Sequence, residues 1–137
     1  MLKILFSVVA IVSLFGCASQ QTPAPGTGQV AAGSVEQQVS ARAEARWAAM
    51  IAQDFDKAHE FLSPGSKAAY PPDQFKARIH PLDWRSAKAV SAVCSEETCT
   101  VKLEIAFYHE RLKREIATML DETWIKDAGN WGLVFNG

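Results

Sequence analysis

The feature that most constrains the fold is an alternation of apolar and mostly polar residues between Cys99 and Tyr108. Successive side chains of a β-strand point to opposite faces of the sheet, so residues two apart share a face. The alternation therefore predicts a strand with one buried and one exposed face. The residues on its predicted buried face are Cys99, Val101, Leu103, Ile105 and Phe107.

The preceding segment, Trp84–Cys94, has a weaker strand pattern and is expected to pair with that strand in a β-hairpin. Residues 95–98 are then the turn. Because the Cβ atoms of directly opposed residues lie roughly 4.5–5.5 Å apart, opposed cysteines can form a disulfide after modest adjustment. The predicted register pairs Cys94 with Cys99, Ala92 with Val101, and Val90 with Leu103.

The residues before the hairpin follow the helical period. Ser34 and Gln37 have the spacing of a capping box, and a long amphipathic helix is expected to follow them, with Arg42, Glu44 and Arg46 on its other faces. A second short helix is expected after a cap at Asp54 and a stop at Ser63–Pro64–Gly65. A third is expected to begin at Pro72 and end at Pro81.

After the hairpin, Glu115–Lys126 and Trp131–Phe135 predict two more strands, joined by a turn at residues 127–130. Helices that precede a run of antiparallel strands are typical of an α+β fold. We therefore expect one antiparallel sheet of about four strands with the helices on one face.

The N-terminal segment predicts export. Lys3 precedes a 12-residue apolar stretch, Ile4–Phe15, which is shorter than the roughly 20 residues that span a bilayer. The residues Leu14, Gly16 and Cys17 resemble the lipobox of bacterial lipoproteins. This resemblance implies removal of residues 1–16 and acylation of Cys17. The alternative is an ordinary secretory signal with an incidental cysteine.

In lipoproteins of this kind, an Asp directly after the cysteine favours retention in the inner membrane. Ala18 stands there in this chain, which implies the periplasmic face of the outer membrane in a Gram-negative cell. Residues 18–33 contain no charged or aromatic residue and are expected to form a flexible linker behind Cys17. Residues 34–137 then form a single domain.

The composition excludes some partners and cofactors. Loss of Lys3 with residues 1–16 changes the formal net charge from −1 to −2, so the chain lacks the charge of a nucleic-acid-binding protein. The pair of cysteines that remains in an exported chain predicts a disulfide between Cys94 and Cys99. The three histidines have no recognised metal-binding spacing, and a C-x₄-C pair beside two glutamates does not favour a redox thiolate. We expect no metal and no other cofactor.

Two stretches resemble packing motifs of the nuclear-transport-factor-2-like superfamily, the cone-shaped fold shared with ketosteroid isomerase and scytalone dehydratase. One is Gln53–Pro64, which is similar to a segment of small bacterial lipoproteins of this type; the other is Trp124, Gly129 and Trp131 near the end of the chain. The resemblance covers about Ser34 to Gly137. It implies a strongly curved sheet with the helices on its concave face, a pocket between them, and homodimers that form through the outer sheet face.

The superfamily pocket would be lined by large apolar side chains, although ordinary core packing is the alternative for each of them. Phe75 and Trp131 are also expected in the interior. The pocket candidates are Trp47, Tyr70, Trp84, Leu103, Ile105, Phe107 and Trp124.

An isomerase or dehydratase of this superfamily needs a carboxylate or histidine as a base, with an acid or oxyanion donor near it. Asp121, in the middle of a predicted strand, is the one weak catalytic candidate. The others have simpler explanations: Asp54 as a helix cap, His59 as a surface residue and His80 as a turn residue. The sequence contains no serine-hydrolase elbow, phosphate-binding glycine loop or zinc-protease motif.

We therefore expect a non-catalytic, membrane-anchored lipoprotein whose domain binds a hydrophobic small molecule or a periplasmic protein. The alternative is a small-molecule isomerase, dehydratase or hydrolase that uses the same pocket. An enzyme should have a buried carboxylate or histidine with a partner among convergent polar groups. A binding domain should have an apolar or collapsed cavity, or an exposed apolar patch.

Overall fold

A computed structural model describes residues 33–80 and 82–137 of the 137-residue chain. The predicted signal segment, Cys17 and the linker up to residue 32 lie outside the described residues. Within the described part, no helix is long and apolar enough to cross a membrane.

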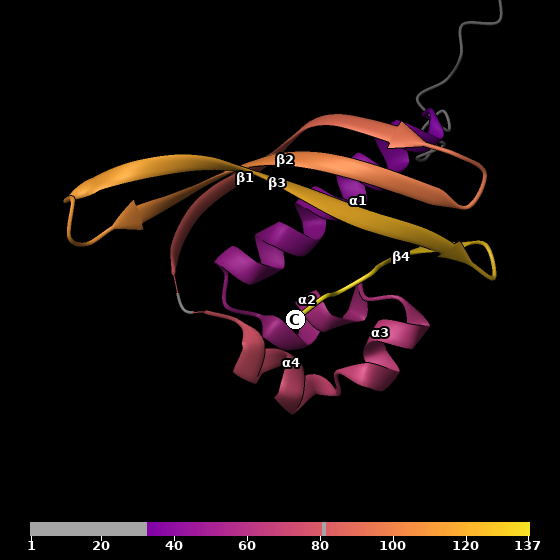
Figure 1. The fold of residues 1–137 in the computed structure, drawn as a ribbon, viewed down its shortest axis with the longest axis horizontal. Coiled ribbons are helices and arrows are strands. Elements are labelled where there is room, and N and C mark those ends of the chain that lie inside the picture. The colour runs from indigo at the N-terminus through magenta and orange to yellow at the C-terminus, as the bar shows by residue number, and fades with distance from the viewer. Residues whose placement is uncertain (1–32, 81) are drawn as a thin grey trace, which may run out of the picture.

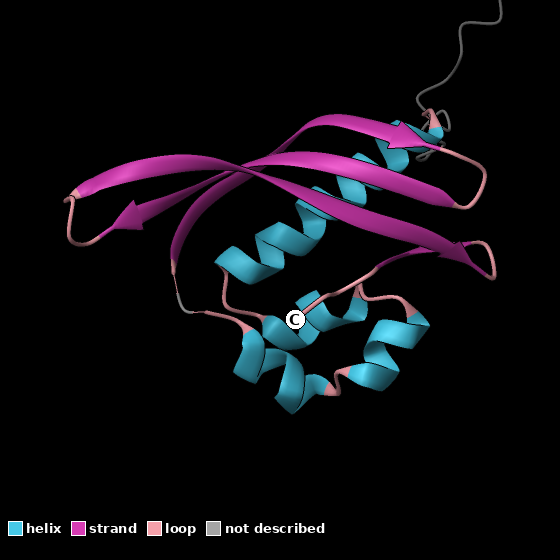
Figure 2. Ribbon diagram, in the orientation of Figure 1, coloured by secondary structure: helices cyan, strands magenta, loops and turns pink. Residues whose placement is uncertain are grey.

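In the described part of the chain, four helices precede four strands (Figures 1 and 2). The strands form one antiparallel sheet in the order β1-β2-β3-β4, so each strand pairs with the next along the chain. Figure 1 shows this sheet bending over α1, with α2, α3 and α4 beyond the end of that helix. The predicted α+β class is confirmed. The elements are α1 (Val35–Ile51), α2 (Phe55–Glu60), α3 (Pro64–Ala69), α4 (Pro72–Arg78), β1 (Asp83–Cys94), β2 (Thr98–His109), β3 (Arg114–Asp127) and β4 (Asn130–Leu133).

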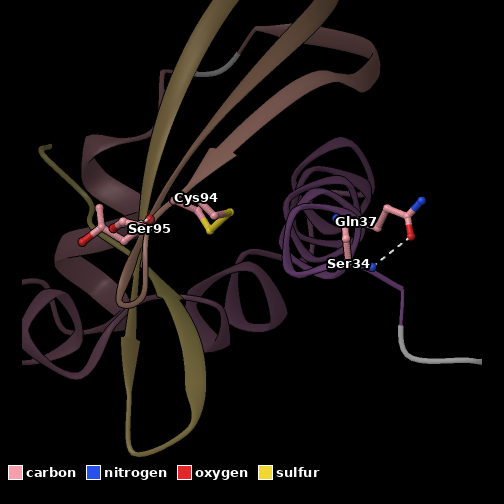
Figure 3. The surroundings of a disulfide bond; sticks show 6 residues. Ser34, Gln37, Cys94 and Ser95 are labelled. Carbon is pink, nitrogen blue, oxygen red and sulfur yellow. Dashed lines mark hydrogen bonds between the residues drawn. A yellow bond between two sulfur atoms is a disulfide. The ribbon is translucent and has the colours of Figure 1, made fainter.

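Local capping explains where the helices begin. The Ser34 hydroxyl accepts a hydrogen bond from the Gln37 N–H, and the Gln37 side chain accepts one from the Ser34 N–H, which completes the predicted capping box of α1 (Figure 3). Asp54 caps α2 as predicted, through the Lys57 N–H. The predicted stop at Ser63–Pro64–Gly65 is instead the start of α3. Ser63 is its cap, and Pro64 is accepted in the first turn because its missing N–H is not needed there.

The register of the β1–β2 hairpin matches the prediction at its closed end and differs further along. Cys94 lies opposite Cys99 and Ala92 opposite Val101. The prediction that Val90 lies opposite Leu103 is wrong, because the ladder is irregular between Ala89 and Ser91 and Ala89 takes that place. A bulge of this kind leaves one residue unpaired, and Val90 is half exposed as a result.

The last strand is also shorter than predicted. β4 ends at Leu133 rather than at Phe135, and the chain then leaves the sheet. The Phe135 ring packs edge-on against the rings of Tyr70 and Phe75, each at a centroid distance of 5.1 Å. The Phe135 N–H donates to the Ser66 hydroxyl, so the end of the chain is held by the α3 and α4 region and not by strand pairing.

The core lies between α1 and the inner face of the sheet. Trp124, Leu103 and Val101 are fully buried from the sheet side, and Val39 and Ala43 from α1. This packing covers the apolar face predicted from the alternation in β2. Burial of such side chains from water is the main source of stability in a domain of this size.

Cys94 and Cys99 form a disulfide next to the turn of the β1–β2 hairpin. In Figure 3 the Cys94 side chain points from the hairpin toward the start of α1, where Ser34 and Gln37 lie. Cys99 is fully buried and Cys94 partly so. The bridge therefore fixes the register of the hairpin at the edge of the core.

Removal of this disulfide is expected to lower the free energy of unfolding by about 2 kcal/mol, because the loop that it closes is short. The test is chemical denaturation of residues 33–137, oxidised and reduced, alongside the Cys94→Ala/Cys99→Ala variant. Val93→Ala, at a neighbouring exposed position, is the control and should change little. Equal stability of the oxidised and reduced forms would show that the bridge does not constrain the hairpin.

Candidate functional site

A cleft of about 410 Å³ opens between the end of α1, the middle of β3, the start of β1 and the C-terminal segment. Its walls are mostly apolar, and charged groups lie at its base and rim. The apolar lining comes from Trp47, Met50, Ile79, Leu82, Trp84, Leu120, Leu133 and Phe135; the polar lining includes Arg46, Arg78, His80, Asp121 and Glu122.

The carboxylate of Glu122 is the centre of the polar base. Its Oε1 accepts hydrogen bonds from Arg46 Nη1 at 2.7 Å and from Trp47 Nε1 at 2.8 Å. Its Oε2 accepts one from Trp124 Nε1 at 3.1 Å. Arg46 and Glu122 are only 4% and 6% exposed, so this is a buried ion pair that joins α1 to β3.

Burial of this pair changes the proton affinity of both groups. Desolvation raises the pKa of Glu122 above its ordinary value, while Arg46 and the two indole donors oppose the change. Desolvation also lowers the pKa of Arg46, and the charge of Glu122 opposes it. The two groups therefore depend on each other for their charges, because neither has water to replace its partner.

Sequence analysis did not find this pair. Arg46 was expected on an outer face of its helix, and that expectation is wrong because the guanidinium is drawn inward to Glu122, 76 residues away in the chain. Glu122 did carry a signal that was missed. It lies two residues before Trp124, so the strand period places both side chains on the inner face.

Two of the predicted pocket residues line the cleft. Trp47 and Trp84 pack edge to face, with ring centroids 5.1 Å apart, and the Arg46 guanidinium lies 5.3 Å from the centre of the Trp47 ring. Two buried donors in this region have no hydrogen-bond partner among the described residues, Arg46 Nε and Trp84 Nε1.

The other predicted pocket residues lie around the cleft or in the core. Leu103, Ile105 and Trp124 are buried among the core residues. Phe107 packs against the far side of Trp84, with centroids 5.8 Å apart, and Tyr70 packs against Phe135. These residues support the walls of the cleft but do not line it.

Asp121, the predicted catalytic candidate, borders the cleft, but the buried carboxylate at the floor of the cleft belongs to its neighbour, Glu122. Strand alternation turns its side chain to the face opposite that of Glu122, where it is 58% exposed and 3.9 Å from Lys102. A catalytic role of Asp121 stays a prediction.

The histidines are separated in space. His80 is exposed at the rim of the cleft, whereas His59 is half-buried, with Nε2 2.8 Å from the Tyr70 carbonyl oxygen, and is not the surface residue that we expected. In the described residues, no group of three or more His, Cys, Asp or Glu side chains is placed to hold a metal ion.

No family model and no curated protein matches this chain. Among solved structures, the chain is similar to the solution structure of a SEC-C-motif-containing protein from Rhodopseudomonas palustris, with a TM-score of 0.57 and 20% identity. The match covers 68% of this chain and 72% of that chain. At this identity, the similarity shows a shared fold and nothing about the ligand or activity of this chain.

Loss of Glu122 alone is expected to cost more than loss of both members of the buried pair. Arg46→Met leaves the Glu122 carboxylate buried without its cation and should lower the free energy of unfolding by about 3–5 kcal/mol. Glu122→Leu leaves the Arg46 guanidinium buried without its anion and should lower it by a similar amount. The double variant Arg46→Met/Glu122→Leu leaves neither charge unpaired. It should be more stable than Glu122→Leu, which leaves the same Trp47 and Trp124 N–H groups without an acceptor and Arg46 without its anion as well.

The measurement is a double-mutant cycle by urea denaturation. The exposed pair of Lys102 and Asp121 is the matched control, and it should couple by less than about 1 kcal/mol. Additive effects at Arg46 and Glu122 would contradict the pairing described above.

Proposed function

We propose that this chain is a lipid-anchored periplasmic protein whose folded domain binds a small, mainly apolar ligand in the cleft. The observation that carries this proposal is a cleft of about 410 Å³ with two tryptophans in its wall and a charged pair at its base. Ligand sites in proteins have this character: mainly apolar walls, a few placed polar groups, and volumes of roughly 300–1,000 Å³.

The arrangement of Glu122 favours binding over catalysis. A general base must direct a free lone pair at the proton that it removes. Here Oε1 accepts from Arg46 and Trp47, and Oε2 accepts from Trp124, so three of the roughly four acceptor positions of the carboxylate are taken. The carboxylate therefore holds the helix and the sheet together, and it lies at the floor of the cleft beneath the ligand.

One observation favours the enzymatic alternative, an isomerase, dehydratase or hydrolase. Glu122 is a buried carboxylate with a raised pKa in a cleft, which is how catalytic acids and bases are often placed. In that case the Arg46 bond would open when substrate binds, and His80 at the rim would be the second titratable group near the substrate.

The proposed location is supported by the sequence. The residues Leu14, Gly16 and Cys17 match the lipoprotein signal, and Ala18 favours the outer membrane. A disulfide between Cys94 and Cys99 suits an oxidising compartment such as the periplasm. We also propose membership of the nuclear-transport-factor-2-like superfamily, on the segment Gln53–Pro64 and the order of helices before a curved sheet.

Ligand binding is tested with the neutral dye N-phenyl-1-naphthylamine and its fluorescence increase in an apolar site. The dye should bind residues 33–137 in the micromolar range. Leu120→Arg places a long charged side chain in the wall of the cleft, so it should weaken binding by at least about tenfold.

Leu112→Arg is the matched control, since Leu112 is an exposed leucine in the β2–β3 turn that does not line the cleft. It should bind the dye as the unsubstituted protein does. Equal binding by all three proteins would place the dye elsewhere and would count against the proposed site.

Anchoring is tested by growth of bacteria that express the full chain with radiolabelled palmitate. The protein should incorporate label and fractionate with outer membranes, and Cys17→Ala should abolish both results. Cys94→Ala is the control for a cysteine that is not acylated and should retain the label. A protein that is exported and cleaved but never labelled would refute the anchor.

A further inference from the structure

Two side chains that line the cleft carry buried hydrogen-bond donors without a partner in the described part of the chain. Arg46 Nε and Trp84 Nε1 are shielded from solvent and have no partner among the described residues. Both side chains line the cleft, and Trp47 lies next to each of them: its ring packs edge to face with Trp84 and lies beneath the Arg46 guanidinium. Buried donors are nearly always paired in native proteins, so two in one cleft require an explanation.

The unpaired groups are of one kind. Both are N–H donors shielded from solvent, so an acceptor in the cleft reaches either one only after its side chain rotates toward the cleft. An unpaired buried donor is costly, and a ligand that supplies the missing acceptor recovers that cost as affinity. The lining thus favours ligands with an acceptor over ligands with a further donor.

The charges in the cleft decide what kind of acceptor fits. Arg46 is already paired with Glu122 at 2.7 Å, so the ion pair at the floor of the cleft has no net charge. A carboxylate ligand would bring a second negative charge close to the buried carboxylate of Glu122. The other basic side chains that line the cleft, Arg78 and His80, are exposed at its rim, where solvent screens the Arg78 charge.

We propose that the cleft selects apolar ligands that carry a neutral carbonyl acceptor, as in a ketone, ester or amide, over carboxylates and over hydrocarbons. This inference rests on the proposed binding function and adds the chemical class of the ligand. The apolar part of the ligand contacts Trp47, Leu120 and Leu133, and rotation of Trp84 or Arg46 brings an unpaired N–H, Nε1 or Nε, to the carbonyl oxygen.

The test compares four naphthalenes of similar size by calorimetry on residues 33–137: 2-acetylnaphthalene, 2-ethylnaphthalene, 2-naphthoate and 2-naphthylmethylammonium. The acetyl compound should bind about tenfold more tightly than the ethyl compound, which has the same shape without the acceptor. The carboxylate should bind less tightly than the ketone, and the ammonium compound least tightly.

Variants identify the donors. Trp84→Phe keeps the ring and removes one unpaired N–H, so the preference for acetyl over ethyl should fall to about threefold or less. Trp131→Phe changes a tryptophan that does not line the cleft and should leave the preference unchanged. Arg46→Lys keeps a cation for Glu122 and removes Nε. If it fails to fold, Arg46→Met/Glu122→Gln replaces it, because the Gln side-chain oxygen still accepts from Trp47 and Trp124.

A second readout is the indole N–H region of a ¹H–¹⁵N spectrum, in which the Trp84 signal is assigned by its loss in Trp84→Phe. The acetyl compound should shift this signal downfield, and the ethyl compound should not. Equal affinity of the acetyl and ethyl compounds, or tightest binding of the carboxylate, would overturn the inference and leave the binding function standing. Binding of none of the four would overturn both.

Discussion

The carboxylate of Glu122 is the point at which the helical layer and the sheet are held in one arrangement. It accepts hydrogen bonds from two residues of α1 and from one of its own strand, and all of these groups are buried. A buried ion pair contributes little net stability, because desolvation offsets the attraction between the charges. The stability therefore comes from the apolar core, and the pair joins the last turns of α1 to β3.

The cleft opens at this junction. Trp47 donates to Glu122 and packs edge to face with Trp84, and both rings line the cleft. Beyond this wall the chain leaves β4 and packs Phe135 against α4, which closes the opposite side. The apolar walls of the cleft and the charged pair at its floor thus come from elements that lie far apart in the sequence. A ligand in the cleft would contact all of these elements.

Local patterns were sufficient to predict most of the fold. The alternation in β2, the caps at Ser34 and Asp54, and the four-residue turn that pairs Cys94 with Cys99 depend on neighbouring residues only. The errors arose where a distant contact or a single extra residue determines the strand register or the end of a helix. The bulge at Val90 shifts the register without altering composition, and Ser63–Pro64–Gly65 serves equally as an end of one helix and a start of the next.

The candidate site was predicted less well for the same reason. Trp47 and Trp84 were found because large apolar residues are expected inside, but Arg46 has the composition of a surface residue until its partner is known. The strand period places Glu122 on the same face as Trp124, but the residue predicted as catalytic was Asp121, which lies on the opposite face. Only the folded arrangement shows that the buried charge is paired and that two nearby donors are not.

The most direct test of this account is the titration of Glu122 itself. Glutamate labelled with ¹³C at the side-chain carboxyl reports each pKa, and Glu122→Gln identifies the signal. We expect a pKa above the ordinary value of 4.5, so that the contribution of this group to stability declines as the pH rises from 4.5 through the raised pKa. A Glu122 signal that titrates at or below 4.5 would show that the Arg46 charge and the indole donors outweigh desolvation, and it would contradict the raised pKa that the account assigns to this buried carboxylate.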